Sequence, residues 1–289
     1  YYTLGLHDNY LVRSAERKYI FRIYRNDWRT DDEIFFELEL LAYLKNSAAN
    51  VSTPIASNSI NLSISIEAPE GRRQGALFPY ADGHAPLGNI SIEECRLLGS
   101  SVAKIHRDST DFRTKFTRST INFQYLIDRS LTILNPFLSA NQCSYLQGIR
   151  TKILKNTSEL GANNADFGVC VGDVNPSNFH INEHGIITHF DFDQCGYGFR
   201  VFDLGKFNSS LFAHKEKYSC TEAFIHGYEN ERKLSDIEKK SIPYFEIASV
   251  IWVMSIHISN VSLLGYKYLE SSFIADRIKR IRVLEDELQ

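Results

Sequence analysis

The sequence predicts an α+β protein in which a small β-rich lobe with one helix precedes a larger, mainly helical lobe. Two observations carry this prediction. β-rich runs fill the first 80 residues, and helical periodicity takes over from about residue 91, broken by a β-rich island at residues 167–192. A chain of 289 residues is long enough for two lobes. We therefore expect an N-terminal lobe at residues 1–80 and a C-terminal lobe at residues 81–289.

The composition argues against several classes of protein. The formal net charge is -3, so no basic surface for nucleic acid is expected. The most apolar stretch, residues 247–258, is too short to span a bilayer, and we expect a buried helix there rather than a membrane segment. Five cysteines without a C-x-x-C pair predict neither a disulfide framework nor a zinc site, and they are typical of the reducing cytoplasm.

The elements of the first lobe follow from alternation and from turn residues. Residues 10–13 and 19–24 are β-rich runs, and the polar residues 14–18 between them are typical of a hairpin turn. A helix is expected from Asp31 to Leu44, because apolar residues recur there at helical spacing. Two further strands and a hinge after them are expected at residues 63–67, 75–78 and 79–83.

The second lobe is predicted to consist mainly of helices. Ser91 and Glu94 have the spacing of a capping box, and the amphipathic residues 92–106 that follow Ser91 predict a helix. The β-rich island separates this helix and its successors from a last helical region. Further helices are expected at residues 123–134, 142–160 and within 218–288.

Three polar side chains in the island, Asp173, Asn178 and Asp191, form a pattern suited to phosphoryl transfer. Asp173 and Asn178 have the D-x-x-x-x-N spacing of a kinase catalytic loop, and Pro176 favours a bend between them. An apolar strand returns after Asn178 and ends near Asp191, so a hairpin could bring both side chains to one Mg²⁺ ion, which prefers hard oxygen ligands. On spacing alone a second interpretation stays open, because Asx residues beside Gly and Pro commonly form turns.

Asp193 is a second carboxylate, two residues after Asp191. In a continuing strand the two side chains would point to the same face. The residues leave two roles open for Asp193, a part in the metal site or the capping of the next turn.

The island and its surroundings resemble a known family. Gly172 to Asn178 is similar to the H-G-D-x-x-x-x-N signature of aminoglycoside phosphotransferases, and Asp191-Phe192 is similar to the I-D-F that follows it. Residues 195–204 resemble the family's C-G-Y-G-P-R-x-x-D-L, and residues 98–106 resemble its L-G-x-x-x-A-x-x-H helix. The resemblance spans nearly the whole chain. It is greatest to homoserine-kinase-like and stress-response-kinase-like members, which share the fold of aminoglycoside and choline kinases.

This resemblance implies a bilobal, protein-kinase-like fold and an ATP- and Mg²⁺-dependent phosphotransferase. The γ-phosphoryl group would move to a hydroxyl of a small molecule, either an antibiotic or a metabolite. The resemblance implies that Asp173 is the catalytic base and that Asn178 and Asp191 are the Mg²⁺ ligands. Asp203 would brace the catalytic loop without taking part in the chemistry.

The resemblance also implies nucleotide-binding residues in the first lobe. Arg22 stands where the family has a strand lysine or arginine at the nucleotide phosphates, and Glu37 would be its ion-pair partner. Backbone groups from Phe78 to Tyr80 would meet adenine at the hinge. Residues 4–9 would form the loop that covers the phosphates, although they contain no G-x-G-x-x-G.

Two departures from the family pattern keep other functions open. Val171 and Asn175 stand where the family has histidines beside the Gly-Asp and inside the loop. These departures leave a nucleotide-binding pseudokinase open, and the similarity to stress-response-kinase-like members leaves a Ser/Thr protein kinase of that type as a second alternative to a small-molecule kinase. The base and both metal positions are present in the sequence, which favours an enzyme over a pseudokinase.

Overall fold

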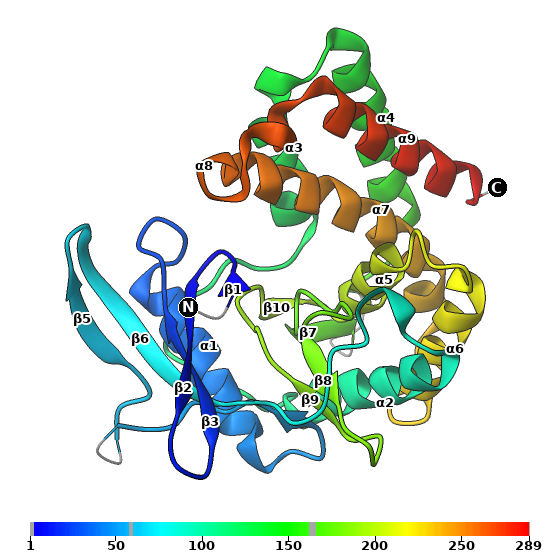
Figure 1. Cartoon of the computed structure of the whole chain (residues 1–289). Coiled ribbons are helices and arrows are strands. Elements are labelled where there is room, and N and C mark those ends of the chain that lie inside the picture. Colours follow the sequence, from blue (N-terminus) through cyan, green and yellow to red (C-terminus); the bar gives the residue numbers. More distant parts are fainter. Residues whose placement is uncertain (1–2, 58–59, 162–165, 289) are drawn as a thin grey trace. The chain divides into compact units, whose positions relative to one another are not determined.

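A computed structural model describes residues 3–57, 60–161 and 166–288. The chain divides into two compact units, each assembled from three stretches of sequence. Unit 1 comprises residues 1–118, 175–196 and 218–233, and unit 2 comprises residues 119–174, 197–217 and 234–289, apart from the residues outside the described ranges. Figure 1 shows the elements of both units. The lobe boundary expected between residues 80 and 81 stays a prediction.

Unit 1 begins with a five-stranded antiparallel sheet in the order β1-β2-β3-β6-β5. The predicted hairpin is confirmed, because β2 and β3 pair in register from Asp8 opposite Ile23 to Arg13 opposite Lys18. β3 is also paired with β6 on its other side, so it is an inner strand of the sheet. The strands are β1 (Thr3–Leu4), β2 (Asp8–Arg13), β3 (Lys18–Ile23), β5 (Ile64–Ala68) and β6 (Gly71–Pro79).

The helix α1 (Asp31–Tyr43) confirms the helix predicted to begin at Asp31. Thr30 caps it, since the Thr30 side chain accepts from the N–H of Glu33 while the Glu33 side chain accepts from the N–H of Thr30. A short 3₁₀ turn, Leu44–Asn46, ends the helix. Buried apolar residues along α1 attach it to the core of unit 1, namely Ile34, Phe36, Leu38, Leu40 and Leu41.

Two helices of unit 1, α2 (Ile92–Asp108) and α6 (Lys217–Glu229), approach each other at glycines. The predicted Ser91–Glu94 capping box at the start of α2 is confirmed. A Cβ atom on Gly99 would lie 1.9 Å from the carbonyl oxygen of Phe224, and one on Gly227 would lie 1.9 Å from the carbonyl oxygen of Arg96. The two backbones are therefore in direct contact, and neither glycine leaves room for a methyl group.

We expect Gly99→Ala to destabilise the protein by on the order of 3 kcal/mol, because the added methyl group must push α6 away from α2. Urea or thermal unfolding would measure the change. The control is Gly148→Ala on another helix, where an added Cβ meets nothing within 4 Å. That control should instead stabilise its helix by about 1 kcal/mol, from propensity alone. Equal stability of the two variants would contradict the close approach of α2 and α6.

A second sheet in unit 1 has the strand order β4-β9-β8. β8 (Phe179–Ile181) and β9 (Ile187–His189) form the predicted hairpin of the island. β9 ends at His189, earlier than the strand expected to reach Asp191, because Asp191 has a φ of 61° and cannot continue an extended strand. β4 (Asn50–Val51) pairs with β9 in parallel. A strand of two residues is too short to be predicted from an alternation pattern.

Unit 2 is mainly helical. The helix expected at residues 142–160 runs from Ala140 to Asn156, capped by Ser139 and Gln142, and the one expected at residues 123–134 opens with a π turn at Gln124–Asp128. The elements of unit 2 are α3 (Arg129–Leu134), α4 (Ala140–Asn156), β7 (Phe167–Cys170), β10 (Gly196–Phe199), α5 (Val201–Ser210), α7 (Asp236–Ser259), α8 (Val261–Leu264) and α9 (Ser271–Asp286).

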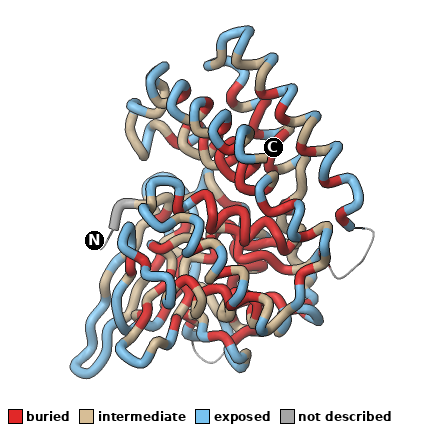
Figure 2. The backbone as a smooth tube through the Cα atoms, turned by 90° about the vertical axis from the view of Figure 1, so that its right-hand side faces the viewer, coloured by how far each residue is buried: buried red, intermediate tan, exposed pale blue. Residues whose placement is uncertain are grey.

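The helix α7 is the core of unit 2, which confirms the predicted buried helix at residues 247–258. It is long and apolar enough to cross a membrane by length and composition alone, but 72% of its most apolar window is buried within the protein. α5 packs directly on it, since a Cβ on Gly205 would lie 2.6 Å from the Cβ of Phe245 and the hydroxyls of Ser209 and Ser249 are 2.9 Å apart. Figure 2 shows the buried stretches of backbone in red.

Candidate active site

The loop that carries Asp173 follows β7 in unit 2 and is fixed by α5. The carboxylate of Asp203, in the first turn of α5, accepts from the backbone N–H groups of Val171 at 2.7 Å and Gly172 at 2.8 Å. Asp203 is 0% exposed, so these two bonds are shielded from water. Gly172 has a φ of 88°, which a side chain would strain, so the glycine permits the turn into Asp173. The contacts confirm the bracing position expected of Asp203.

A lysine that the sequence did not single out contacts the predicted base. The ammonium of Lys206 lies 2.7 Å from the Asp173 carboxylate. Lys206 is 5% exposed, whereas the Asp173 side chain retains 30% of its exposure. The signal in the sequence is faint, because it consists only of a lysine one helical turn after Asp203.

In unit 1 the β8–β9 hairpin brings Asn178 and Asp191 to the same end of the sheet. Asn178 immediately precedes β8, and its carbonyl oxygen accepts from the N–H of Phe190, which immediately follows β9. Asp191 is therefore one residue from that bond. The left-handed backbone at Asp191 is uncommon for a residue other than glycine, and such conformations concentrate at functional sites. The Asp191 side chain is 40% exposed.

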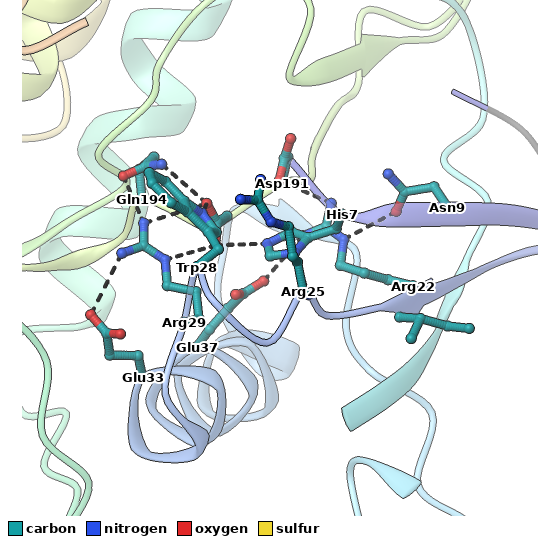
Figure 3. Close-up of polar contacts among 12 residues, drawn as sticks. His7, Asn9, Arg22, Arg25, Trp28, Arg29, Glu33, Glu37, Asp191 and Gln194 are labelled. Carbon is teal, nitrogen blue, oxygen red and sulfur yellow. Dashed lines mark hydrogen bonds and ion pairs between the residues drawn. The ribbon is translucent and has the colours of Figure 1, made fainter. Parts of the chain in front are cut away.

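Arg22 connects β3 to Asp191 and to α1 (Figure 3). Its guanidinium lies 2.9 Å from the carboxylate of Asp191 and 3.4 Å from that of Glu37, and its Nε donates to the side-chain oxygen of Asn9 at 3.2 Å. Burial alone would lower the pKa of Arg22, but the negative charges of Asp191 and Glu37 outweigh it and raise the pKa. Burial raises the pKa of Glu37, and the charge of Arg22 opposes that change. The expected partnership of Arg22 with Glu37 is thus present in the structure.

Phe78 lies in the last residues of β6, and Tyr80 directly follows this strand in the same unit. Phe78 is buried, and the Arg22 guanidinium carbon lies 5.8 Å from the centre of its ring. The N–H of Tyr80 donates to the carbonyl oxygen of Lys18 at 3.1 Å, and its ring meets that of His180 edge to face at 5.6 Å. These contacts fix the end of β6 and the residue after it between β3 and the β8–β9 hairpin. The contact of its backbone with adenine stays a prediction.

Asp193 has neither of the two roles that the sequence left open. Its carboxylate is 2.9 Å from Nε2 of His7, 2.7 Å from the indole nitrogen of Trp28 and 3.0 Å from Nε of Arg29. Because Nδ1 of His7 accepts from the N–H of Arg25, Nε2 carries the proton and donates to Asp193. Both carboxylate oxygens are thus occupied by protein donors, and the side chain cannot also ligate a metal or cap a turn.

This cluster predicts acid sensitivity. Burial would raise the pKa of Asp193, but Arg29 and His7 outweigh it and hold the pKa well below its ordinary value of 3.8. A depressed carboxyl pKa adds stability that is fully present above the unfolded value and is lost as the pH falls from 3.8 toward the folded pKa. The wild type should therefore lose stability below about pH 4 more steeply than a variant without this carboxylate.

Asp193→Asn is expected to destabilise the protein by about 3 kcal/mol at neutral pH, because it leaves the buried guanidinium of Arg29 with less compensating charge. Chemical denaturation at a series of pH values would measure both effects. Asp31→Asn is the control, because it breaks an exposed pair with Arg72 at 2.8 Å and should change stability by less than about 1 kcal/mol. Equal losses in the two variants would contradict the cluster.

The structure brings some of the predicted site residues together within one unit. Asp173 belongs to unit 2, and its arrangement with the remaining site residues stays a prediction. The residues found in unit 1 are Arg22, Glu37, Phe78, Tyr80, Asn178 and Asp191.

The residues at the end of the β8–β9 hairpin fit a Mg²⁺ ion that is held mainly by nucleotide phosphates. Among residues 3–57, 60–161 and 166–288, no group of three or more His, Cys, Asp or Glu side chains gathers in a way that could hold a metal. Mg²⁺ does not require such a cage, because it commonly takes one or two protein oxygens together with phosphate oxygens and water. Asn178 and Asp191 offer an amide oxygen and a half-exposed carboxylate, which are donors of the right kind.

Known proteins resemble this chain along most of its length. Residues 4–237 match the model of the phosphotransferase enzyme family. An uncharacterized protein of Synechocystis sp. is 32% identical over 282 residues, which cover 97% of this chain and 78% of that protein.

Two solved structures share its fold. The microcompartment-associated aminopropanol kinase matches with a TM-score of 0.84 and 20% identity, over 99% of this chain and 90% of that chain. Amicoumacin kinase hAmiN, solved in complex with AMP-PNP, Ca²⁺ and Ami, matches with a TM-score of 0.76 and 18% identity, over 96% of this chain and 88% of that chain. At these identities the likeness concerns the fold, and it confirms the predicted α+β, protein-kinase-like fold.

Proposed function

The chain belongs to the phosphotransferase enzyme family, and we propose that it is an ATP- and Mg²⁺-dependent kinase that phosphorylates a hydroxyl group of a small molecule. The resemblance to aminoglycoside phosphotransferases and choline kinases drawn from the sequence is confirmed at the level of the family. The ATP and Mg²⁺ dependence, the acceptor and the roles of single residues are parts of the proposal.

One observation carries the proposal furthest, and it is the contact of Arg22 with both Glu37 and Asp191. A kinase needs a cation near the nucleotide phosphates and a carboxylate that holds the metal beside them. Arg22 is held in place by the buried Glu37 and reaches the half-exposed Asp191 at 2.9 Å. Arginine can bind phosphates because its planar guanidinium group donates two hydrogen bonds at once.

In the proposed reaction Asp173 accepts a hydrogen bond from the acceptor hydroxyl and orients its oxygen toward the γ-phosphorus. A bond forms between that oxygen and phosphorus, the bond from phosphorus to the β–γ bridging oxygen breaks, and the hydroxyl proton passes to Asp173. Asn178 and Asp191 would hold Mg²⁺, which when bound supplies positive charge at the β- and γ-phosphates. Arg22 adds positive charge at the same phosphates, so positioning and electrostatics supply the catalysis.

The nucleotide base is proposed to lie against the segment from Phe78 to Tyr80. Phe78 and Pro79 pair with Ile20 and Tyr19 of β3, the strand that carries Arg22, so this segment lies beside the proposed phosphate-binding residue. Amicoumacin kinase, which shares the fold, is described in complex with the ATP analogue AMP-PNP and a divalent cation, and this supports a nucleotide and a metal as ligands here.

The acceptor is proposed to be a small molecule rather than a protein. The kinases of similar fold are named for aminopropanol and amicoumacin, and both names denote small molecules. The five cysteines are free thiols, which supports a reducing compartment, and we propose the cytoplasm.

Acceptor-dependent release of ADP tests this function. The purified protein would be incubated with ATP, Mg²⁺ and a panel of amino alcohols, hydroxy amino acids, sugars and hydroxylated antibiotics. Turnover with at least one of them, abolished by EDTA and restored by excess Mg²⁺, is the expected result. Radiolabel transfer to proteins in place of all small molecules would favour the Ser/Thr protein kinase. Nucleotide binding without transfer to any acceptor or to water would favour the pseudokinase.

A further inference from the structure

We propose that Lys206 is a positioning residue for the catalytic base, holding the Asp173 carboxylate in the orientation that receives the acceptor hydroxyl. This inference rests on the proposed function of Asp173. It concerns a residue outside the D-x-x-x-x-N loop and outside the nucleotide-binding residues of unit 1. The observation behind it is the 2.7 Å contact between the Lys206 ammonium and the Asp173 carboxylate.

The burial of the two partners differs in a way that suits this role. Lys206 is 5% exposed, and a buried ammonium is retained only where a paired charge or hydrogen bonds compensate its lost hydration. The Asp173 side chain is 30% exposed, so a ligand can still reach it. The pair therefore has a fixed, buried donor on one side and an accessible acceptor on the other.

The helix α5 fixes the Asp173 segment at two points. Asp203 and Lys206 are three residues apart and lie on the same face of α5. Asp203 holds the backbone N–H groups of Val171 and Gly172, directly before Asp173, and Lys206 holds the side chain of Asp173 itself. One helix thus sets both the path of the loop and the direction of its carboxylate.

α5 is itself immobilised by α7. Gly205 lies between the two anchoring residues, and a Cβ atom there would lie 2.7 Å from the N of Glu246 on α7. One turn after Lys206, the Ser209 hydroxyl is 2.9 Å from that of Ser249. Because the backbone of α5 packs directly against α7 at Gly205, the lysine has a rigid base from which to orient Asp173.

Orientation of the base matters to a kinase, because catalysis consists mainly of aligning the hydroxyl with the phosphorus. A displacement of about 1 Å in such an arrangement can lower the rate by about 100-fold. Lys206→Met preserves the length of the side chain and removes its donor. We expect it to lower kcat by about 10- to 100-fold and to leave the KM for ATP within about twofold of the wild type.

Lys206→Arg is the conservative variant. Its kcat should be at least about tenfold higher than that of Lys206→Met, because arginine restores a cationic donor. The matched control is Lys152→Met, which removes a lysine that pairs with Glu285 at 3.1 Å elsewhere in unit 2. That variant should keep the wild-type kcat. Thermal unfolding of all variants would show whether each is folded at the assay temperature.

A double-mutant cycle separates failure of this inference from failure of the proposed function. Lys206→Met should add no further loss of kcat in an Asp173→Asn background, since both substitutions act through one carboxylate. Wild-type kcat in Lys206→Met, with the kcat of Asp173→Asn strongly lowered, would overturn the positioning role and leave the proposed function standing. Full turnover in Asp173→Asn would instead refute the assignment of the base. A coupling seen in unfolding but absent from kcat would reduce Lys206 to a structural residue and overturn the inference.

Discussion

Asp173→Ala is expected to lower kcat for phosphorylation of the acceptor by about 10³-fold, within the range that a positioned general base contributes. ATP affinity should stay within about threefold of the wild type, because the proposed nucleotide ligands are other residues. Steady-state kinetics with the acceptor from the ADP-release screen, together with calorimetric titration of ATP and Mg²⁺, would measure the two quantities.

Asp173→Ala also removes the partner of the buried Lys206 ammonium, so part of its effect could come from lost stability. Asp173→Asn is the companion variant, because an amide keeps the shape of the side chain and can still accept a bond from Lys206 through its oxygen. An inactive, stably folded Asp173→Asn would assign the loss to chemistry. A kcat within tenfold of the wild type in both variants would rule out Asp173 as the base.

Asp191→Asn is expected to weaken the binding of Mg-ATP by at least about tenfold, because the carboxylate proposed to hold the metal is replaced by a neutral amide. Asparagine tolerates the left-handed backbone at this position, where φ is 61°, so the substitution isolates the charge from the backbone. Alanine would add a backbone cost of about 1 kcal/mol there, and it is the less informative variant.

Titration calorimetry with and without Mg²⁺ would measure this effect. Binding of ATP without metal should change little or improve, since Arg22 loses a charged competitor 2.9 Å away. The control is Asp128→Asn, which alters another half-exposed carboxylate, one that pairs with Arg150 in unit 2. An unchanged Mg²⁺ dependence in Asp191→Asn would remove this residue from the proposed metal site.

Elements whose signals are local could be predicted from the amino-acid sequence. The capping box at Ser91 and the hairpin with its turn at residues 14–18 depend on residues within a few positions of one another, and both predictions are confirmed. The β8–β9 hairpin, which brings Asn178 next to Phe190, was also predictable, because a strand that returns after a short turn pairs with the strand before it. Such features follow from propensity and spacing, whose range is a single turn or hairpin.

Which charged side chains meet depends on the tertiary structure. Asp193 is held by His7, 186 residues away in the chain, and by Arg29, 164 residues away, and no spacing rule connects them. The pairing of Lys206 with Asp173 is of the same kind, since a lysine on a helix is ordinarily a solvated residue until packing buries it. The physical reason is that the pairing of charges is set by burial, and burial is fixed by how helices and sheets pack over distances that local sequence patterns do not encode.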